Sequence, residues 1–258
     1  MRRLLVAIGA LVLASSAGAQ ITRPELIAVE RPRVLAAARR YLNDAPVTVT
    51  AFRAERSAGG IHDFYSEGDY WWPDPAHPEG PYVRRDGETN PDNFVAHRDA
   101  MRRLSQIVPA LVAAYEITRE RRYAARAADH LRAWFVAEST RMNPNLLYGQ
   151  AIKGVATGRG IGIIDTIHLV EVAQAVRELE RLGAIDRATL EGTKGWFRQY
   201  LAWMTTHPYG IAEREAVRAI LQTVAREALG TEDRASFVRL LDSLDERSAV
   251  ILSIFGRG

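Results

Sequence analysis

Two pairs of helical segments separated by long irregular loops are the feature of this sequence that most restricts its fold. Apolar residues recur at spacings of three and four over residues 94–118 and 121–135, and again over 164–182 and 186–206. A further helix is expected over residues 30–42. Short turns join the members of each pair, which predicts antiparallel helical hairpins. Because no series of alternating polar and apolar residues indicates strands, the expected fold class is all-α.

Polar residues at the predicted helix ends support these boundaries. Asn93 is the expected N-cap of the long helix, Asp165 that of the helix after residue 164, and Asp186 that of the next one. Gly183 is expected to stop the third of these helices in a left-handed conformation. The last helix should end at the His-Pro-Tyr-Gly segment 207–210.

The two loops, residues 44–92 and 138–162, are rich in Pro and Gly, and the first is also rich in aromatic residues. Long loops in a compact domain are usually functional or disordered, and aromatic richness argues against disorder. Paired helices with functional loops between the pairs suggest an α/α toroid or an array of helical repeats.

The N-terminal residues predict export. Arg2 and Arg3 precede an apolar run from Leu4 to Leu13, and Ala17-Gly18-Ala19 has the form of a cleavage site. The run is too short to span a bilayer of about 30 Å, so a membrane anchor is the weaker alternative. We therefore expect residues 1–19 to be a signal peptide, a periplasmic or secreted location, and no membrane association after cleavage.

Charge and cysteine content exclude several classes of function. The sequence has 34 basic and 31 acidic residues, and without Arg2 and Arg3 the two signs nearly balance. No dense basic stripe indicates a nucleic-acid partner. Lys occurs only at 153 and 194, so Arg carries the positive charge; Arg pairs bidentately with carboxylates and would suit an acidic sugar polymer. The absence of Cys excludes disulfides and thiol chemistry.

Five motifs in the middle of the chain point to a family. They are DFYSEGDYWWPDP at 63–75, PYVRRDGETNP at 81–91, NLLYGQAI at 145–152, GRGIGIIDT at 158–166 and WMTTHPYG at 203–210. With these motifs in this order, the chain resembles the alginate lyase superfamily of uronate polysaccharide lyases over about residues 25–215.

This resemblance implies an α/α toroid with a groove for an anionic polymer such as alginate or a related uronan. The implied reaction is β-elimination. One group neutralises the C6 carboxylate, a base removes the C5 proton, and an acid protonates the departing O4. A Tyr or a His commonly serves as base or acid in such lyases, and neither a cofactor nor a metal is expected.

The sequence departs from the family after residue 215. Family members usually continue from the His-Pro-Tyr-Gly segment into an Asn-Asn-His segment, whereas residues 208–258 contain no His here. We therefore expect a truncated or rearranged gene, an incomplete toroid and weak activity. The expected units are a lyase-like helical domain over 20–215 and a divergent helical tail over 216–258.

Four residues are the expected catalytic candidates. Arg159 lies in a Gly-rich turn, where it can hold a substrate carboxylate. His168 lies three residues after Asp165, so the two can touch on a helix, as an oriented catalytic His requires, although a structural pair has the same spacing. His207 and Tyr209 directly precede the point where the family's catalytic segment would begin.

Substrate contacts are expected from the loops and from the start of the long helix. Aromatic side chains on a loop can stack on sugar faces, although they also bury large areas in a core. His97 lies near a helix N-terminus, where the neutral form is favoured, and a packed structural His is its alternative interpretation. The expected substrate-binding residues are Tyr70, Trp71, Trp72, Asn93, His97, Arg98, Tyr148 and Asp165.

Two other functions remain open. The chain can be a module that binds acidic glycans without cleaving them. It can also be an inverting glycoside hydrolase, for which Glu67, Asp69 and Asp74 supply candidate carboxylates. A metal site is not expected, because neither an H-E-x-x-H motif nor paired His spacing occurs. The Gly-x-Gly-x-Gly run at 158–162 lacks the preceding strand that a phosphate-binding loop requires.

Overall fold

The structure is a computed structural model that describes residues 23–215. Most of this region is helical, and none of its helices is long and apolar enough to cross a membrane. The predicted signal peptide 1–19 and the predicted tail 216–258 lie outside the described residues and stay predictions. The helices are α1 (Arg23–Tyr41), α2 (Ala96–Thr118), α3 (Arg121–Phe135), α4 (Leu169–Arg181) and α5 (Arg187–Thr206), with short 3-10 helices η1 (Val49–Ala51) and η2 (Gly160–Thr166).

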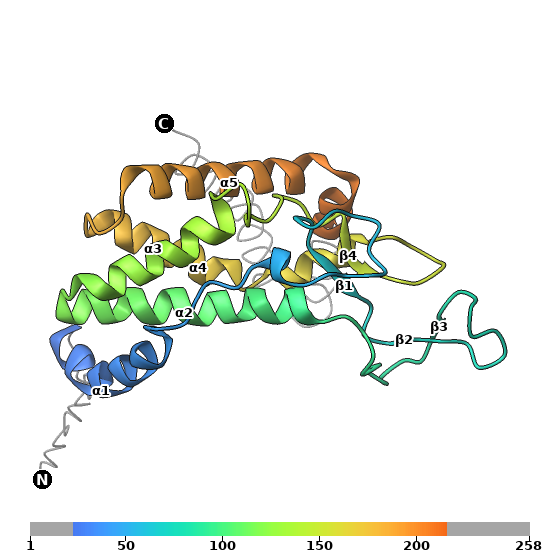
Figure 1. The fold of residues 1–258 in the computed structure, drawn as a ribbon, viewed down its shortest axis with the longest axis horizontal. Coiled ribbons are helices and arrows are strands. Elements are labelled where there is room, and N and C mark those ends of the chain that lie inside the picture. The colour runs from blue at the N-terminus through green and yellow to red at the C-terminus, as the bar shows by residue number, and fades with distance from the viewer. Residues whose placement is uncertain (1–22, 216–258) are drawn as a thin grey trace, which may run out of the picture.

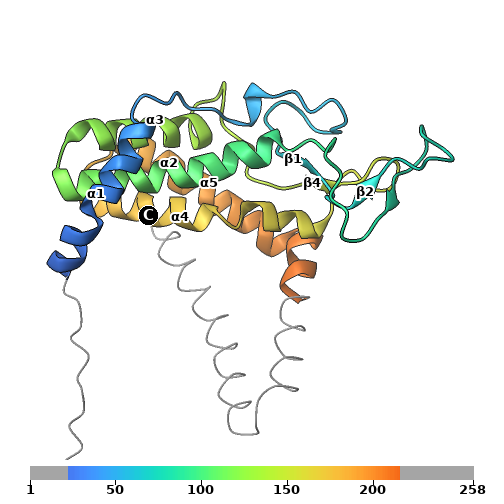
Figure 2. The same ribbon diagram turned by 90° about the horizontal axis from the view of Figure 1, so that it is seen from below.

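Helix α2 is the centre of the helical part, and it packs against α1, α3 and α4 (Figures 1 and 2). Its buried face repeats at helical spacing and includes Met101, Leu104, Val108 and Leu111. Arg119 ends the helix in the left-handed conformation, with φ 61°, and its N–H donates to the carbonyl of Tyr115. The chain then turns directly into α3, which forms the expected helical hairpin.

Aromatic side chains join α3 to α5. The ring of Trp196 lies 4.8 Å from that of Phe135 and 5.2 Å from that of Tyr200, measured between centroids. The indole N–H of Trp196 donates to the carbonyl of Met142, so this buried polar group is satisfied. Burying each such side chain stabilises the fold by roughly 1.5–3 kcal/mol.

The helix predictions are confirmed for α2, α3 and α5, whose ends lie within about two residues of the expected positions. The helix expected over 30–42 begins earlier, at Arg23, and contains Pro32. The helix expected from residue 164 begins at Leu169, because η2 occupies 160–166. The chain does leave α5 at His207, but residues 208–215 form a new helical segment with Pro208 in its first position, where proline is tolerated.

Two of the three expected N-caps are wrong. Asp186 does cap α5, because its carboxylate accepts a hydrogen bond from the N–H of Thr189 at 2.9 Å. The N-cap of α2 is Val95 rather than Asn93, and the N-cap of α4 is His168 rather than Asp165. Asn93 and Asp165 instead make tertiary hydrogen bonds to the loops.

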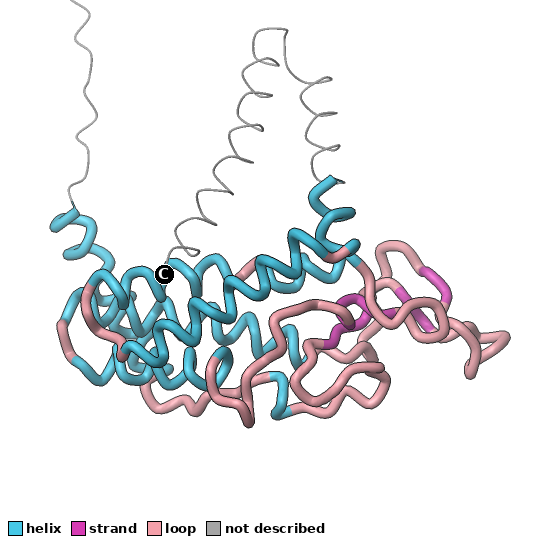
Figure 3. Tube along the Cα trace, turned by 90° about the horizontal axis from the view of Figure 1, so that it is seen from above, coloured by secondary structure: helices cyan, strands magenta, loops and turns pink. Residues whose placement is uncertain are grey.

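Four short strands form where the two long loops meet, and the all-α prediction missed them. The parallel pair is β1 (Tyr65–Glu67) with β4 (Tyr148–Ala151), and the antiparallel pair is β2 (Trp71–Trp72) with β3 (Val83–Arg84). Strands of two to four residues are too short to show alternation in sequence. Figure 3 shows the helices gathered at one end of the molecule and the strands and loops at the other. The loops 44–92 and 138–162 therefore converge at the start of α2.

Close backbone contact holds the turn 158–162 against β4. A Cβ atom on Gly158 would lie 1.9 Å from the carbonyl oxygen of Leu147, a distance that no side chain tolerates. The N–H of Arg159 donates to the carbonyl of Gly149 at 2.9 Å. Gly158 thus fixes the position of the Arg159 backbone.

We expect Gly158→Ala to lower the free energy of unfolding by roughly 1–3 kcal/mol, the usual cost of forcing extra atoms into a packed site. The matched control is Gly195→Ala in α5, where an added Cβ meets nothing within 4 Å. It should raise stability by roughly 0.5–1 kcal/mol, because Ala favours a helix interior. Urea unfolding followed by Trp fluorescence measures both, and equal stabilities for the two variants would contradict this packing.

Candidate functional site

A cavity of about 230 Å³ opens where the two loops meet. This volume is below the roughly 300–1,000 Å³ of most small-molecule sites, so the cavity admits a small group such as one unit of a longer sugar chain. Residues from β2, β3, β4 and the start of η2 form its wall. The lining residues are Asp69, Tyr70, Trp71, Arg84, Gln150, Arg159 and Ile161.

Arg159 is a cation in this wall without a carboxylate partner among residues 23–215. Its Nε donates to the backbone carbonyl of Gln150 at 2.7 Å, and its Nη2 lies 3.5 Å from the side-chain oxygen of the same residue. Burial and the positive charge of Arg84 lower the pKa of Arg159, but a guanidinium remains charged at any physiological pH. The wall therefore presents a positive charge that no described acidic residue neutralises.

Gly68 lets Arg159 and Trp71 approach the end of β1 closely. A Cβ atom on Gly68 would lie 2.6 Å from the indole of Trp71 and 2.9 Å from Nη2 of Arg159. Any side chain at this position would displace both groups. The glycine thus allows the indole and the guanidinium to lie side by side in the cavity wall.

Gln150 holds Arg159 in place through a strained backbone. Its φ is 53°, in the left-handed region that few non-glycine residues adopt. Its N–H donates to Oγ of Ser66 at 2.8 Å, and its side-chain amide donates to Asp165 at 3.3 Å. Both oxygens of Gln150 face Arg159. Strain of this kind concentrates at functional sites, where the surrounding structure maintains it.

Behind the wall, the buried guanidinium of Arg98 in α2 fixes the two carboxylates of Asp69 and Asp165. Its Nη1 donates to Asp69 at 2.8 Å, and its Nε lies 3.4 Å from Asp165. Asp165 also accepts a 2.5 Å hydrogen bond from the hydroxyl of Ser66. Arg98 therefore orients both Asp69, on the cavity wall, and Asp165, beneath it.

A second ion pair supports β1. Arg56 binds Glu67 with two hydrogen bonds of 2.5 and 2.6 Å, and Glu67 also accepts from the N–H of Phe94 and the hydroxyl of Tyr65. Burial alone would raise the pKa of Glu67, but these hydrogen bonds outweigh burial and hold the pKa below its usual range. Burial and the neighbouring Glu67 raise the pKa of Tyr65.

These ion pairs weaken the glycoside hydrolase alternative. An inverting hydrolase needs a carboxylic acid with a raised pKa opposite a second carboxylate. Glu67 is instead held ionised, and Asp69 is paired with Arg98. Asp74 pairs with His77 on the surface, and hydrogen bonds from Ala76 and His77 lower its pKa.

The structure brings five of the predicted site residues together. Tyr70, Trp71 and Arg159 line the cavity, and Arg98 and Asp165 lie directly behind its wall. These residues come from the first loop, α2 and the second loop. The sequence motifs that carry them thus converge in space.

Four predicted substrate-binding residues lie outside the cavity lining. Trp72 donates its indole N–H to the carbonyl of Glu88, and Tyr148 lies over Gly59. Asn93 donates its amide to the carbonyl of Gly68. The fourth is His97.

His97 is packed rather than available to a ligand. It is 2% exposed, and Nδ1 accepts a hydrogen bond from the N–H of Tyr65, so Nε2 carries the proton and faces the carbonyl of Phe52 at 3.2 Å. Burial lowers its pKa, and the ring of Phe94 lies 4.7 Å away. The structural interpretation of this residue fits these contacts, in which His97 ties β1 to α2.

The other three catalytic candidates, His168, His207 and Tyr209, also lie outside the lining. The ring of His207 stacks on Trp203 with 5.1 Å between centroids, and its Nδ1 accepts from the N–H of Tyr209. The hydroxyl of Tyr209 donates to the carbonyl of Gly158, so Tyr209 supports the turn that carries Arg159. His168 is half-buried, and Asp165 bonds to Ser66 and Gln150, so the expected Asp165–His168 pair is not formed among the described residues.

Sequence reasoning missed Gln150, Ser66 and Arg84 as parts of the site, and it considered Asp69 only as a hydrolase carboxylate. All four lie inside the motifs at 63–75, 81–91 and 145–152, and this position was the sequence signal that could have identified them. The left-handed conformation of Gln150 has no sequence signature. Within residues 23–215, no group of three or more His, Cys, Asp or Glu residues converges to hold a metal ion.

Comparison with known proteins identifies the family of this chain. A family profile described as alginate lyase matches residues 48–219. The chain belongs to the alginate lyase family. Among solved structures, it is similar to an alginate lyase from Bacteroides ovatus, with 36% identity, a TM-score of 0.65 and 71% of this chain covered. A search of curated proteins gave no match.

The match covers 49% of the Bacteroides ovatus chain, so this chain spans about half the length of the alginate lyase structure that it resembles. The profile match includes both loops that form the cavity, η2 and the helices around them. The family match therefore covers the whole Arg159 site.

The positive φ of Gln150 predicts that glycine is more stable than alanine at this position, which is the reverse of the usual order. We expect Gln150→Gly to be more stable than Gln150→Ala by about 1 kcal/mol, because glycine adopts a positive φ without steric cost. Both variants lose the same amide hydrogen bonds. The control pair is Gln174→Gly and Gln174→Ala on the exposed face of α4, where Ala should be better by roughly 1 kcal/mol. Thermal unfolding measures all four, and the same order at both positions would rule out the left-handed conformation.

Proposed function

We propose that this chain binds an acidic, uronate-containing polysaccharide at the Arg159 cavity, and that β-elimination of such a polymer is the reaction this site serves. The observation that carries the proposal is Arg159, a fixed and partly buried cation without an acidic partner among residues 23–215. A buried charge without a partner is costly, and a ligand carboxylate would supply the missing partner.

The geometry of Arg159 suits a carboxylate. Gln150 accepts from Nε and from one side of Nη2, which leaves Nη1 and the second N–H of Nη2 for the ligand. A guanidinium edge forms two parallel hydrogen bonds with a carboxylate, and such charge-assisted pairs are roughly twice as strong as neutral hydrogen bonds. The adjacent rings of Trp71 and Tyr70 offer flat apolar faces against which a sugar ring can pack.

The same arrangement supports β-elimination. Pairing the C6 carboxylate with Arg159 stabilises the negative charge that develops when the C5 proton leaves. Asp69 is committed to Arg98, so we assign to the hydroxyl of Tyr70 the proton that the departing O4 takes up. Neither His168 nor His207 lines the cavity, so the base that takes the C5 proton is missing from the described wall. Such a group contributes roughly 10²–10⁴-fold, and we therefore expect slow elimination.

That missing group also favours the second candidate function, binding of acidic glycans without cleavage. The two candidates make the same prediction for binding and differ in the product. Elimination creates a carbon–carbon double bond conjugated with the carboxylate, which absorbs in the ultraviolet, whereas binding alone creates no chromophore.

We further propose that the hairpins α2–α3 and α4–α5 are part of an (α/α) toroid whose loops form one rim. The packing of α2 against α1, α3 and α4, with both long loops at one end, supports this arrangement (Figure 1). The charged N-terminus, apolar run and Ala17-Gly18-Ala19 site support a periplasmic or secreted location.

Affinity electrophoresis through gels that contain alginate tests the binding proposal. We expect Arg159→Met and Trp71→Ala to weaken retardation about tenfold or more, since each removes a direct contact. Trp72→Ala and Arg177→Met are the matched controls, because these residues lie outside the cavity lining. They should run close to the parent protein. Equal mobility of all five proteins would contradict the proposal.

Ultraviolet absorbance in the same alginate solutions measures elimination. The parent protein should release unsaturated product slowly, and Tyr70→Phe should abolish the release while it preserves retardation. Retardation without any product from the parent would favour the binding function instead.

A further inference from the structure

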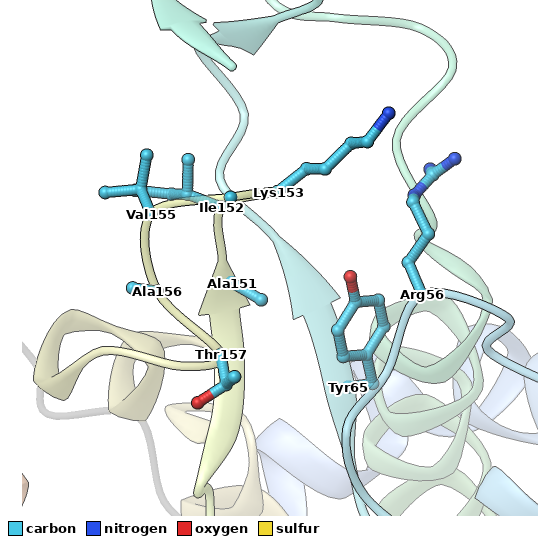
Figure 4. Close-up of a pocket in the computed structure, with 9 residues that line it drawn as sticks. Arg56, Tyr65, Ala151, Ile152, Lys153, Val155, Ala156 and Thr157 are labelled. Atoms are coloured by element: carbon cyan, nitrogen blue, oxygen red, sulfur yellow. The ribbon is translucent and has the colours of Figure 1, made fainter. Parts of the chain in front are cut away.

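A second, larger cavity lies beside β1, and the Arg159 site does not use it. Its volume is about 470 Å³, and Arg56, Tyr65 and residues 151–157 line it (Figure 4). The two cavities share no lining residue. Strand β4 contributes to both, because Gln150 lines the first cavity and the next residue, Ala151, lines the second.

One side of this cavity is cationic. Figure 4 shows the side chains of Lys153 and Arg56 extending toward the same side, with the hydroxyl of Tyr65 close to Arg56. Glu67 fixes Arg56 through two hydrogen bonds, and the carbonyl of Asp92 accepts a third. Arg56 is thus rigid, but Glu67 already balances its charge. Lys153 therefore supplies the positive charge that a ligand can use.

The protein partner of Lys153 is weak and replaceable. Nζ of Lys153 lies 3.6 Å from a carboxylate oxygen of Glu79, whose side chain is 99% exposed. An exposed ion pair of this kind contributes about 0–1 kcal/mol, so a ligand carboxylate can displace Glu79.

The backbone around Lys153 is held firmly. Its carbonyl accepts a hydrogen bond from the N–H of Tyr82 at 3.0 Å, and its Nζ lies 5.7 Å from the centroid of the Tyr82 ring. Gly154 has φ 73° and packs on Pro81. A Cβ atom on Gly154 would lie 2.8 Å from Cα of Pro81. This segment therefore presents Lys153 from a defined turn.

The other side of the cavity is apolar. Ile152 and Val155 lie there, apart from the cationic side chains (Figure 4), and Val155 is 56% exposed. A cavity with an apolar wall and a cation matches a sugar acid, which has an apolar ring face and a carboxylate on its edge. A neutral sugar would leave Lys153 unused.

We infer that this cavity is a second binding site for one uronate unit, in which Lys153 pairs with the carboxylate, Arg56 and Tyr65 border it, and Val155 contacts the ring. Only the choice of a uronate rests on the proposed function. The position and the charge of the site rest on the contacts of Lys153 and Arg56.

The two lysines of the sequence, Lys153 and Lys194, allow a direct test. Reductive methylation with ¹³C-formaldehyde keeps the charge of both, and Lys153→Arg and Lys194→Arg assign their methyl signals in NMR spectra. Titration with an alginate trisaccharide should shift the Lys153 signal saturably. The Lys194 signal should stay in place, because that residue pairs with Glu180 outside both cavities.

Variants of Lys153 test its contribution to affinity. Lys153→Met should weaken binding of the trisaccharide about tenfold, as expected for the loss of one charge-assisted contact. Lys153→Arg should retain most of the affinity. An uncharged trisaccharide of the same length should not shift the Lys153 signal, and equal shifts with both sugars would overturn carboxylate recognition.

Arg159→Met separates this inference from the proposed function. If the Lys153 signal still shifts in this variant, the second site stands independently of the first. If the Lys153 signal never moves while Arg159→Met abolishes binding, the second site is wrong and the proposed function stands. If Arg159→Met changes nothing while Lys153 responds, the Arg159 site is wrong and the second site stands.

Discussion

The guanidinium of Arg98 is the contact on which the site depends. It projects from the first turn of α2 and binds the carboxylate of Asp69, the backbone carbonyl of Glu67 and the carboxylate of Asp165. Its partners come from the first long loop and from η2 at the end of the second, so one buried side chain ties both segments to the central helix. Removing one partner of a buried ion pair such as Arg98–Asp165 typically costs about 3–5 kcal/mol, because the remaining charge has no compensation. The cavity wall therefore owes its geometry to α2 as much as to its own residues.

The type and the ends of the helices could be predicted from the sequence, but the contacts between distant segments could not. The apolar stripes of α2 and α3 are long enough to fix their type and ends. Strands β1 and β4 depend instead on contacts between distant segments, such as Ser66 with Gln150, which are 84 residues apart. Asn93 and Asp165 look like N-caps because their side chains accept hydrogen bonds readily. In the structure, the amide nitrogen of Asn93 donates to the carbonyl of Gly68, and the carboxylate of Asp165 accepts from the hydroxyl of Ser66, both across the loop junction.

The site residues also divide into those that the sequence could predict and those that depend on tertiary contacts. Trp71, Tyr70 and Arg159 were predicted because their residue types and loop positions suit an acidic sugar, and all three line the cavity. Gln150 escaped notice because its role depends on a left-handed backbone and on partners from two other segments. Adjacent residues of β4 then line two cavities, each with a basic residue from the second loop. These two basic residues are the groups that we propose bind the carboxylates of a uronate polymer.

A crystal structure of the full chain with a bound alginate trisaccharide tests the proposed Arg159 site. We expect a ligand carboxylate within hydrogen-bonding distance of the terminal nitrogens of Arg159, with a sugar ring against Trp71. Gln150 should keep its positive φ and its contacts with Arg159. A bound trisaccharide that leaves Arg159 without a carboxylate would contradict carboxylate binding at this cavity.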